Sequence, residues 1–135
     1  MDSGERSDPE RSELVDVYWR YYRASNGSRQ ERLAADRYRW AYETVSEIVE
    51  IGQPDAVEIL VELSEAESDD FVALSNLGAG PIEQLLCHHA DEFIDQIDSA
   101  ARQSSSFRMA LRCAWYDASL PTEIVHRVRR FGEPY

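Results

Sequence analysis

The chain has 135 residues, of which 43% are hydrophobic and 30% charged, and its formal net charge at pH 7 is −12. This length suits a single domain, and the composition is that of a globular protein rather than of a wholly disordered chain. No apolar run is long enough to span a membrane and no signal peptide stands at the N-terminus, so we expect a cytoplasmic protein.

The first predicted element is a flexible N-terminal arm, residues 1–11, followed by a helical domain over residues 12–135. From Leu14 onward, hydrophobic residues recur with the spacing of one helix face. The Asn-Gly-Ser sequence at 26–28 should end this helix. A second helical region is expected over about 30–51.

Gly52 and Pro54 predict the end of that region and the start of a third helix over about 54–66. Ser68 is the expected N-cap of a short helix that follows. The Gly-Ala-Gly-Pro sequence at 78–81 should break the chain and begin another helix.

That helix should end near Ala90, and three further helices complete the prediction. The first should open at Asp91, and serines 104–106 should cap the second. Pro121 should begin the last helix. No stretch alternates with the period of a β-strand, so we predict an all-α fold of about seven helices, arranged as a bundle or as a short stack of helical hairpins.

The negative charge is concentrated in the middle of the chain. Residues 40–101 contain 15 acidic side chains and no lysine or arginine, whereas residues 1–39 contain eight acids and eight arginines. Residues 102–135 carry six arginines and three acids. Such a field disfavours direct binding to nucleic acid or to an anionic membrane, and it attracts basic proteins.

Nine of the central acids form three sets with helical spacings of four and three residues. The sets are Glu43, Glu47 and Glu50; Glu58, Glu62 and Glu65; and Asp91, Asp95 and Asp98. Each set lies on one face of its predicted helix, where like charges at this spacing cost about 0.2–0.5 kcal/mol per pair. The two interpretations are a solvated outer surface and a surface matched to a basic partner.

Three adjacent residues, Cys87, His88 and His89, are of types that bind metals or act in catalysis. Structural zinc sites use four ligands in paired spacings, whereas adjacent helical residues point about 100° apart. We therefore predict no metal, no cofactor and no catalytic residue. A small enzyme or metal-binding protein that uses these three residues is the alternative.

Aromatic residues are dense between residues 18 and 42, and most of them should belong to the core. Trp19 lies off the main apolar stripe of its helix, which makes it a candidate for an exposed anchor that a partner binds. Exposed aromatic residues would also suit the pairing of identical subunits. A homo-oligomeric scaffold is therefore a further alternative.

Three blocks in the second half of the chain resemble the pattern of a known family. Residues 77–86 read L-G-A-G-P-I-E-Q-L-L, residues 93–102 read F-I-D-Q-I-D-S-A-A-R, and residues 107–115 read F-R-M-A-L-R-C-A-W. They resemble a family of small bacterial helical domains of unknown function with G-P-[LI]-E-x-L-L, F-I and F-R-x-x-L-x-x-x-W blocks. Trp19 and Tyr22 match its W-x-x-Y-like element. The resemblance implies a helical core and no established activity.

The functional hypothesis combines the charge with the absence of catalytic motifs. We expect a non-enzymatic, acidic helical domain that binds a basic protein, most concretely an immunity or antitoxin-type protein that neutralises a basic toxin. The acids of the three sets would pair with arginines and lysines of that partner and would accelerate its association.

Overall fold

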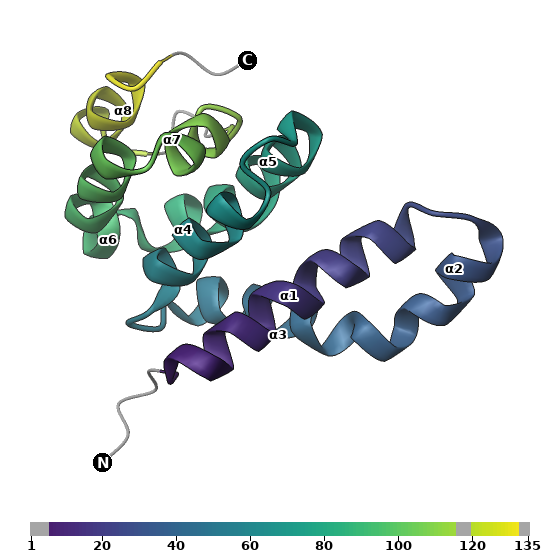
Figure 1. Cartoon of the computed structure of the whole chain (residues 1–135). Helices are drawn as coiled ribbons and strands as arrows, with labels where there is room; N and C mark the ends of the chain where they lie inside the picture. The colour runs from purple at the N-terminus through teal and green to yellow at the C-terminus, as the bar shows by residue number, and fades with distance from the viewer. Residues whose placement is uncertain (1–5, 116–119, 133–135) are drawn as a thin grey trace.

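The computed structural model describes residues 6–115 and 120–132, and its secondary structure there is entirely helical (Figure 1). The elements are α1 (Asp8–Ser25), α2 (Arg29–Ala34), a 3₁₀ turn η1 (Ala35–Tyr38), α3 (Arg39–Ile51), α4 (Ala56–Ala66), α5 (Phe71–Leu77), a π-helical segment η2 (Gly78–Ile82), α6 (Glu83–Gln103), α7 (Ser105–Leu111) and α8 (Thr122–Arg129). The predicted all-α class is confirmed. The predicted number of helices differs slightly, because η1 divides one predicted helix, whereas α6 runs through the boundary predicted near residue 90.

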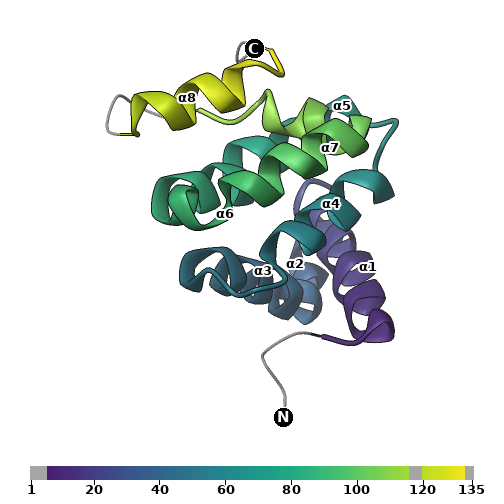
Figure 2. The same cartoon turned by 90° about the vertical axis from the view of Figure 1, so that its left-hand side faces the viewer.

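Helix α4 lies at the centre of the molecule. Figure 2 shows it between α1 to α3 on one side and α5 to α7 on the other, with α8 outermost. Ile59, Leu60 and Leu63 on α4 are completely buried. Because α4 packs against α1, α6 and α7, it connects the two halves of one hydrophobic core.

Helix α1 begins earlier than the sequence suggests. Ser7 caps its N-terminus in a capping box with Glu10, and Pro9 occupies the first turn. Residues 8–11, which we expected to belong to a flexible arm, are therefore helical. The predicted end of the helix is confirmed, since Asn26 is its C-cap.

The predicted second helical region is interrupted by the 3₁₀ turn η1, which separates α2 from α3. Its end is confirmed at Gly52, which adopts the left-handed conformation with φ of +79°. A glycine suits this position because a left-handed backbone is strained for residues with a Cβ atom.

The predicted break at residues 78–81 is wrong. The chain stays helical from α5 through η2 into α6, and the π-helical turn contains Pro81. Gly78 serves close packing instead, because a Cβ atom there would lie 2.0 Å from the carbonyl oxygen of Ala110 on α7. The predicted N-cap Ser68 is also wrong, since Asp70 accepts the capping hydrogen bond from the Ala73 amide.

Helix α6 kinks where the sequence suggested a boundary between two helices. His89 has non-helical torsion angles (φ −142°, ψ 31°), but the helix continues on both sides of it. The other two predicted starts are confirmed: Ser104 caps α7, and Pro121 precedes α8. Within the two described ranges, no helix combines the length and the apolar character that crossing a bilayer requires.

Candidate functional site

Three arginines near the N-terminus pair with acids on α4 or at its two ends. Arg6 lies 3.2 Å from Asp55, and Arg11 Nε donates to Glu62 at 2.9 Å. Arg23 pairs with Glu67 at the other end of α4. Arginines from residues 1–39 therefore neutralise some of the acids of residues 40–101 within the folded molecule.

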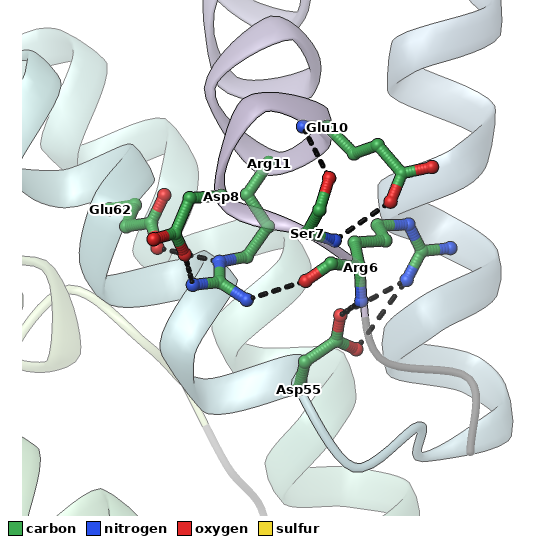
Figure 3. A network of polar contacts seen from close by, with 7 residues as sticks. All are labelled: Arg6, Ser7, Asp8, Glu10, Arg11, Asp55 and Glu62. Carbon is green, nitrogen blue, oxygen red and sulfur yellow. Dashed lines mark hydrogen bonds and ion pairs between the residues drawn. The ribbon is translucent and has the colours of Figure 1, made fainter. Parts of the chain in front are cut away.

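Figure 3 shows the network at the start of α1. The side chain of Asp55 is completely buried and accepts hydrogen bonds from the backbone and the guanidinium of Arg6. Arg11 donates to the carbonyl oxygen of Arg6 at 2.9 Å and to Asp8 at 2.6 Å. This network fixes the entry of α1 against the N-terminus of α4.

Two of the three acids in the set on α6, Asp95 and Asp98, form ion pairs within the molecule. Arg127 on α8 lies 2.8 Å from Asp95 and 3.0 Å from Asp98, and Arg102 lies 2.8 Å from Asp98. Asp98 is only 5% exposed, so it does not offer the partner-binding carboxylate expected from the sequence. Of this set, Asp91 is exposed and carries no ion pair within the described chain.

Two opposing effects act on the pKa of Asp98. Burial by itself would raise it, but the hydrogen bond from Arg127 and the charges of Arg102, Arg130 and Arg127 lower it below its ordinary value. The ionised form is therefore favoured in the folded protein. Asp98 acts as a structural connection between α6 and α8.

The set on α3 remains free. Glu43, Glu47 and Glu50 are exposed, and none of their carboxylates makes an ion pair with the described part of the chain. They form an acidic face on the helix that follows η1.

The set on α4 lines a groove, which we call the acidic groove. It has a volume of about 490 Å³ and lies between α4 and α6. Its lining consists of Val57, Glu58, Val61, Glu62, Glu65, Gln96, Ser99, Ala100, Gln103 and Ser104. Glu58 and Glu65 are exposed and carry no ion pair within the described residues, whereas Glu62 is paired with Arg11.

The opposite wall of the acidic groove supplies uncharged hydrogen-bonding groups. Gln103 donates to the hydroxyl of Ser99 at 3.1 Å, and Gln96 lies on the same helix. Val57, Val61 and Ala100 provide apolar surface between the two walls. The groove therefore combines carboxylates, polar groups and an apolar floor.

Trp19 is not an exposed anchor, so that prediction is wrong. Only 2% of its surface is exposed, and its indole N–H donates to the carbonyl oxygen of Leu63 at 3.1 Å. Helix α1 packs on two sides, with Trp19 toward α4 and Tyr18 against Tyr42 of α3. This double packing buries a residue that lies off the main apolar stripe.

The adjacent residues Cys87, His88 and His89 differ in their surroundings. Cys87 and His88 are exposed on α6, whereas His89 lies within hydrogen-bonding distance of the Glu50 carbonyl oxygen (2.7 Å) and of Glu92 (3.0 Å). Among residues 6–115 and 120–132, no group of three histidine, cysteine or acidic residues is placed to hold a metal ion.

Both partners of His89 accept hydrogen bonds, so the doubly protonated imidazolium satisfies them together. The carbonyl of Glu50 raises the pKa of His89 most, burial opposes this effect, and Glu92 raises the pKa further. The net direction is upward from the ordinary value of 6.5. His89 thereby ties the kink of α6 to the C-terminal end of α3.

His89→Gln is expected to cost more stability at acidic than at alkaline pH. Because the folded-state pKa is raised, the stabilisation is complete below the unfolded value of 6.5 and is lost as the pH rises through the folded value. Urea unfolding of wild type and variant at about pH 5.5 and about pH 8.5 measures this difference.

The matched control for this experiment is His88→Gln. It removes the neighbouring exposed imidazole, which makes neither hydrogen bond, and it should change stability little at either pH. An effect of His89→Gln that is equal at both pH values would contradict the assignment.

A second hollow, which we call the tyrosine hollow, lies between α1, α3 and the η2 segment. It has a volume of about 430 Å³ and is lined by Tyr18, Tyr21, Tyr22, Ser25, Asn26, Tyr42, Ser46, Asn76, Ala79, Gly80, Pro81 and Gln84. The sequence placed most of these tyrosines in the core. Tyr18 is buried, but Tyr42 is 45% exposed, and only the packing of α1 on α3 brings the rings together.

The family blocks have structural roles in this arrangement. Glu83 of the first block accepts a hydrogen bond from the backbone amide of Trp115 at the end of the third block, at 2.8 Å. Leu85, Phe93 and Phe107 from the three blocks are buried in one core. The blocks thus hold α6 and α7 together.

The comparisons with known proteins agree with this pattern. The profile of a family of unknown function (DUF6869) matches residues 28–133. No curated protein and no solved structure is significantly similar to the chain.

Proposed function

Because the chain belongs to the family of unknown function DUF6869, its role has to be inferred from its own surface, and we propose that it is a non-enzymatic domain that binds a basic protein. The observation that carries this proposal is the acidic groove. Glu58 and Glu65 stand there without an ion-pair partner in the described chain, although acids on both sides of them are paired.

The chemistry of the acidic groove suits an arginine or lysine side chain. The aliphatic part of such a side chain packs on Val57, Val61 and Ala100, while its charged end reaches a carboxylate. The amides of Gln96 and Gln103 can hydrogen-bond the backbone of the bound segment. A guanidinium between carboxylates forms charge-assisted hydrogen bonds, which are stronger than neutral ones.

The free acids on α3 have a separate role in this proposal. Glu43, Glu47 and Glu50 lie outside the acidic groove and add to the negative field of the molecule. Such a field raises the rate at which a basic partner arrives, and its effect declines as salt screens it.

The most concrete form of this function is neutralisation of a basic toxin by an immunity or antitoxin-type protein in the cytoplasm. Burial of toxin arginines or lysines in the acidic groove would occupy residues that the toxin needs for its own anionic target. Charge complementarity of this kind also gives specificity for the cognate toxin over other proteins.

Reversal of two charges in the acidic groove tests the proposal. A peptide of alternating arginine and leucine, acetylated and amidated at its ends, should bind the wild type with an affinity that falls as salt is raised to about 0.5 M. Glu58→Arg with Glu65→Arg should weaken binding at least about tenfold, which corresponds to about 1.4 kcal/mol. Isothermal titration calorimetry measures both effects.

The control variant carries Glu43→Arg and Glu47→Arg, which change the net charge by the same amount on α3. It should slow association but leave the dissociation rate close to that of wild type. An equal loss of peptide affinity in both double variants would show that only the overall electrostatic field of the protein matters. Binding that is insensitive to salt and to the reversal at Glu58 and Glu65 would overturn the proposal.

The immunity role has its own test with the basic product of a neighbouring gene. Co-expression of the two proteins should restore growth that the basic protein alone inhibits. The variant reversed at Glu58 and Glu65 should lose this rescue, whereas the α3 variant should retain it. Rescue by both variants would contradict neutralisation through the acidic groove.

A further inference from the structure

The tyrosine hollow differs chemically from the rest of the surface. None of its lining side chains is charged, although 30% of the chain is. A phosphate or carboxylate ligand would find no counter-charge there and would be repelled by a molecule of net charge −12. An anionic ligand is therefore excluded from this hollow, and no lining carboxylate is present to pair with a cation.

The aromatic rings of the hollow form a continuous surface across two helices. The ring centroids of Tyr21 and Tyr42 lie 5.4 Å apart with a 34° tilt, and those of Tyr18 and Tyr42 lie 6.3 Å apart and stacked. Surfaces of this kind bind the pyrrolidine rings of proline-rich segments in the polyproline II conformation. The volume of about 430 Å³ is within the range of ordinary ligand pockets.

The polar groups of the hollow also match such a segment. A polyproline II helix has no internal hydrogen bonds, and proline has no amide hydrogen, so the segment presents mainly carbonyl acceptors. The hydroxyls of Tyr18, Tyr21 and Tyr42 and the amide of Gln84 make no hydrogen bond with the described part of the chain. They are available as donors.

The wall of the hollow opposite the tyrosines is open at Gly80. A Cβ atom built on this residue meets nothing within 4 Å beyond its own helix backbone and its chain neighbours. The π-helical segment η2 thus leaves space beside the rings of α1 and α3, and π-helical turns are frequent at functional sites.

We propose that the tyrosine hollow binds a proline-rich segment of a partner protein in the polyproline II conformation. The tyrosine rings pack against the prolines, and the phenol hydroxyls with Gln84 donate to the carbonyl oxygens of the segment. This site is separate from the acidic groove, and it does not depend on the function proposed for that groove.

The test is an NMR titration of the whole protein with an uncharged peptide of nine residues, seven prolines and two alanines, acetylated and amidated. Saturable shifts should be confined to α1, α3 and η2. Gly80→Leu fills the open space and should weaken binding at least about tenfold. Gln84→Ala removes an exposed donor and should weaken it as well.

The folding of each variant is checked by thermal unfolding. Gly80→Leu should remain folded at the temperature of the titration, because its Cβ atom meets no atom of another element. If Gly80→Leu unfolds, the test rests on Gln84→Ala alone. This substitution should not affect folding, since the exposed Gln84 side chain makes no hydrogen bond with the described residues. The Glu58→Arg/Glu65→Arg variant should bind the peptide as wild type does.

Three results would overturn the proposal. One is the absence of saturable shifts at millimolar peptide, and another is wild-type binding by both Gly80→Leu and Gln84→Ala. The third is binding of cellohexaose in the hollow in place of the peptide, because a saccharide also packs on aromatic rings. A peptide in which glycine replaces every proline should not bind.

Discussion

Gly78→Ala is expected to lower the free energy of unfolding by about 2 kcal/mol. The added methyl group would lie 2.0 Å from the carbonyl oxygen of Ala110, and a backbone atom of a packed helix cannot move away cheaply. Overpacking costs up to about 3 kcal/mol, and removal of a helical glycine returns up to about 1 kcal/mol. Chemical denaturation at equilibrium measures the difference.

The matched control lies two residues along the same π-helical segment. Gly80→Ala adds the same methyl group where nothing beyond its own helix backbone and its chain neighbours lies within 4 Å, so it avoids a clash with α7. Pro81 follows and disfavours a helical conformation for a residue with a Cβ atom, so we expect a small loss of stability, clearly below that of Gly78→Ala. An equal loss in both variants would mean that the π-helical backbone itself requires glycine, and the contact with α7 would not be the cause.

Arg6→Ala is expected to cost about 2–4 kcal/mol. The substitution leaves the carboxylate of Asp55 completely buried without its cation, and removal of one partner from a buried pair is strongly destabilising. The loss is moderated because the Arg6 side chain is 23% exposed. Thermal and urea unfolding should both report the change.

Two variants control this result. Arg20→Ala breaks an ion pair with Asp16 in which both side chains are more than half exposed, and it should cost no more than about 0.5 kcal/mol. Arg6→Ala combined with Asp55→Asn should be less destabilised than Arg6→Ala alone, because no charge then stays buried. A double variant as unstable as the single one would contradict this explanation.

The features predicted correctly from the sequence are local ones. Gly52, Ser104 and Pro121 mark helix ends through their own backbone preferences and side-chain hydrogen bonds, and the structure confirms all three. Gly78 belongs to the same residue type as Gly52, yet its role depends on Ala110, 32 residues away in the chain. A local pattern cannot distinguish a glycine that ends a helix from one that lets two helices approach.

In the candidate site, too, the sequence predicts the local geometry but not the contacts between distant segments. Helical spacing places Glu58, Glu62 and Glu65 on one face, and these residues do line one groove. The spacing of Asp91, Asp95 and Asp98 is identical, but Arg127 from α8 covers two of them. Which acids keep a free charge is determined by arginines that are distant in the chain.

The tyrosine hollow could not be predicted because its walls come from three separate segments. The sequence indicates amphipathic helices in residues 14–51, but not that Tyr42 of α3 packs against Tyr18 and Tyr21 of α1. The uncharged lining appears only when η2 closes the other side.

The packing of α1 has a consequence for how the protein can be divided. The region that matches the family begins at residue 28, but α1 ends at Ser25 and supplies Leu14, Tyr18 and Trp19 to the shared core. A fragment without α1 would expose that part of α4 and leave the Leu63 carbonyl without its indole donor. We therefore expect the smallest autonomous folding unit of this chain to include α1, so that α1 should accompany residues 28–133 in a transplant or fusion.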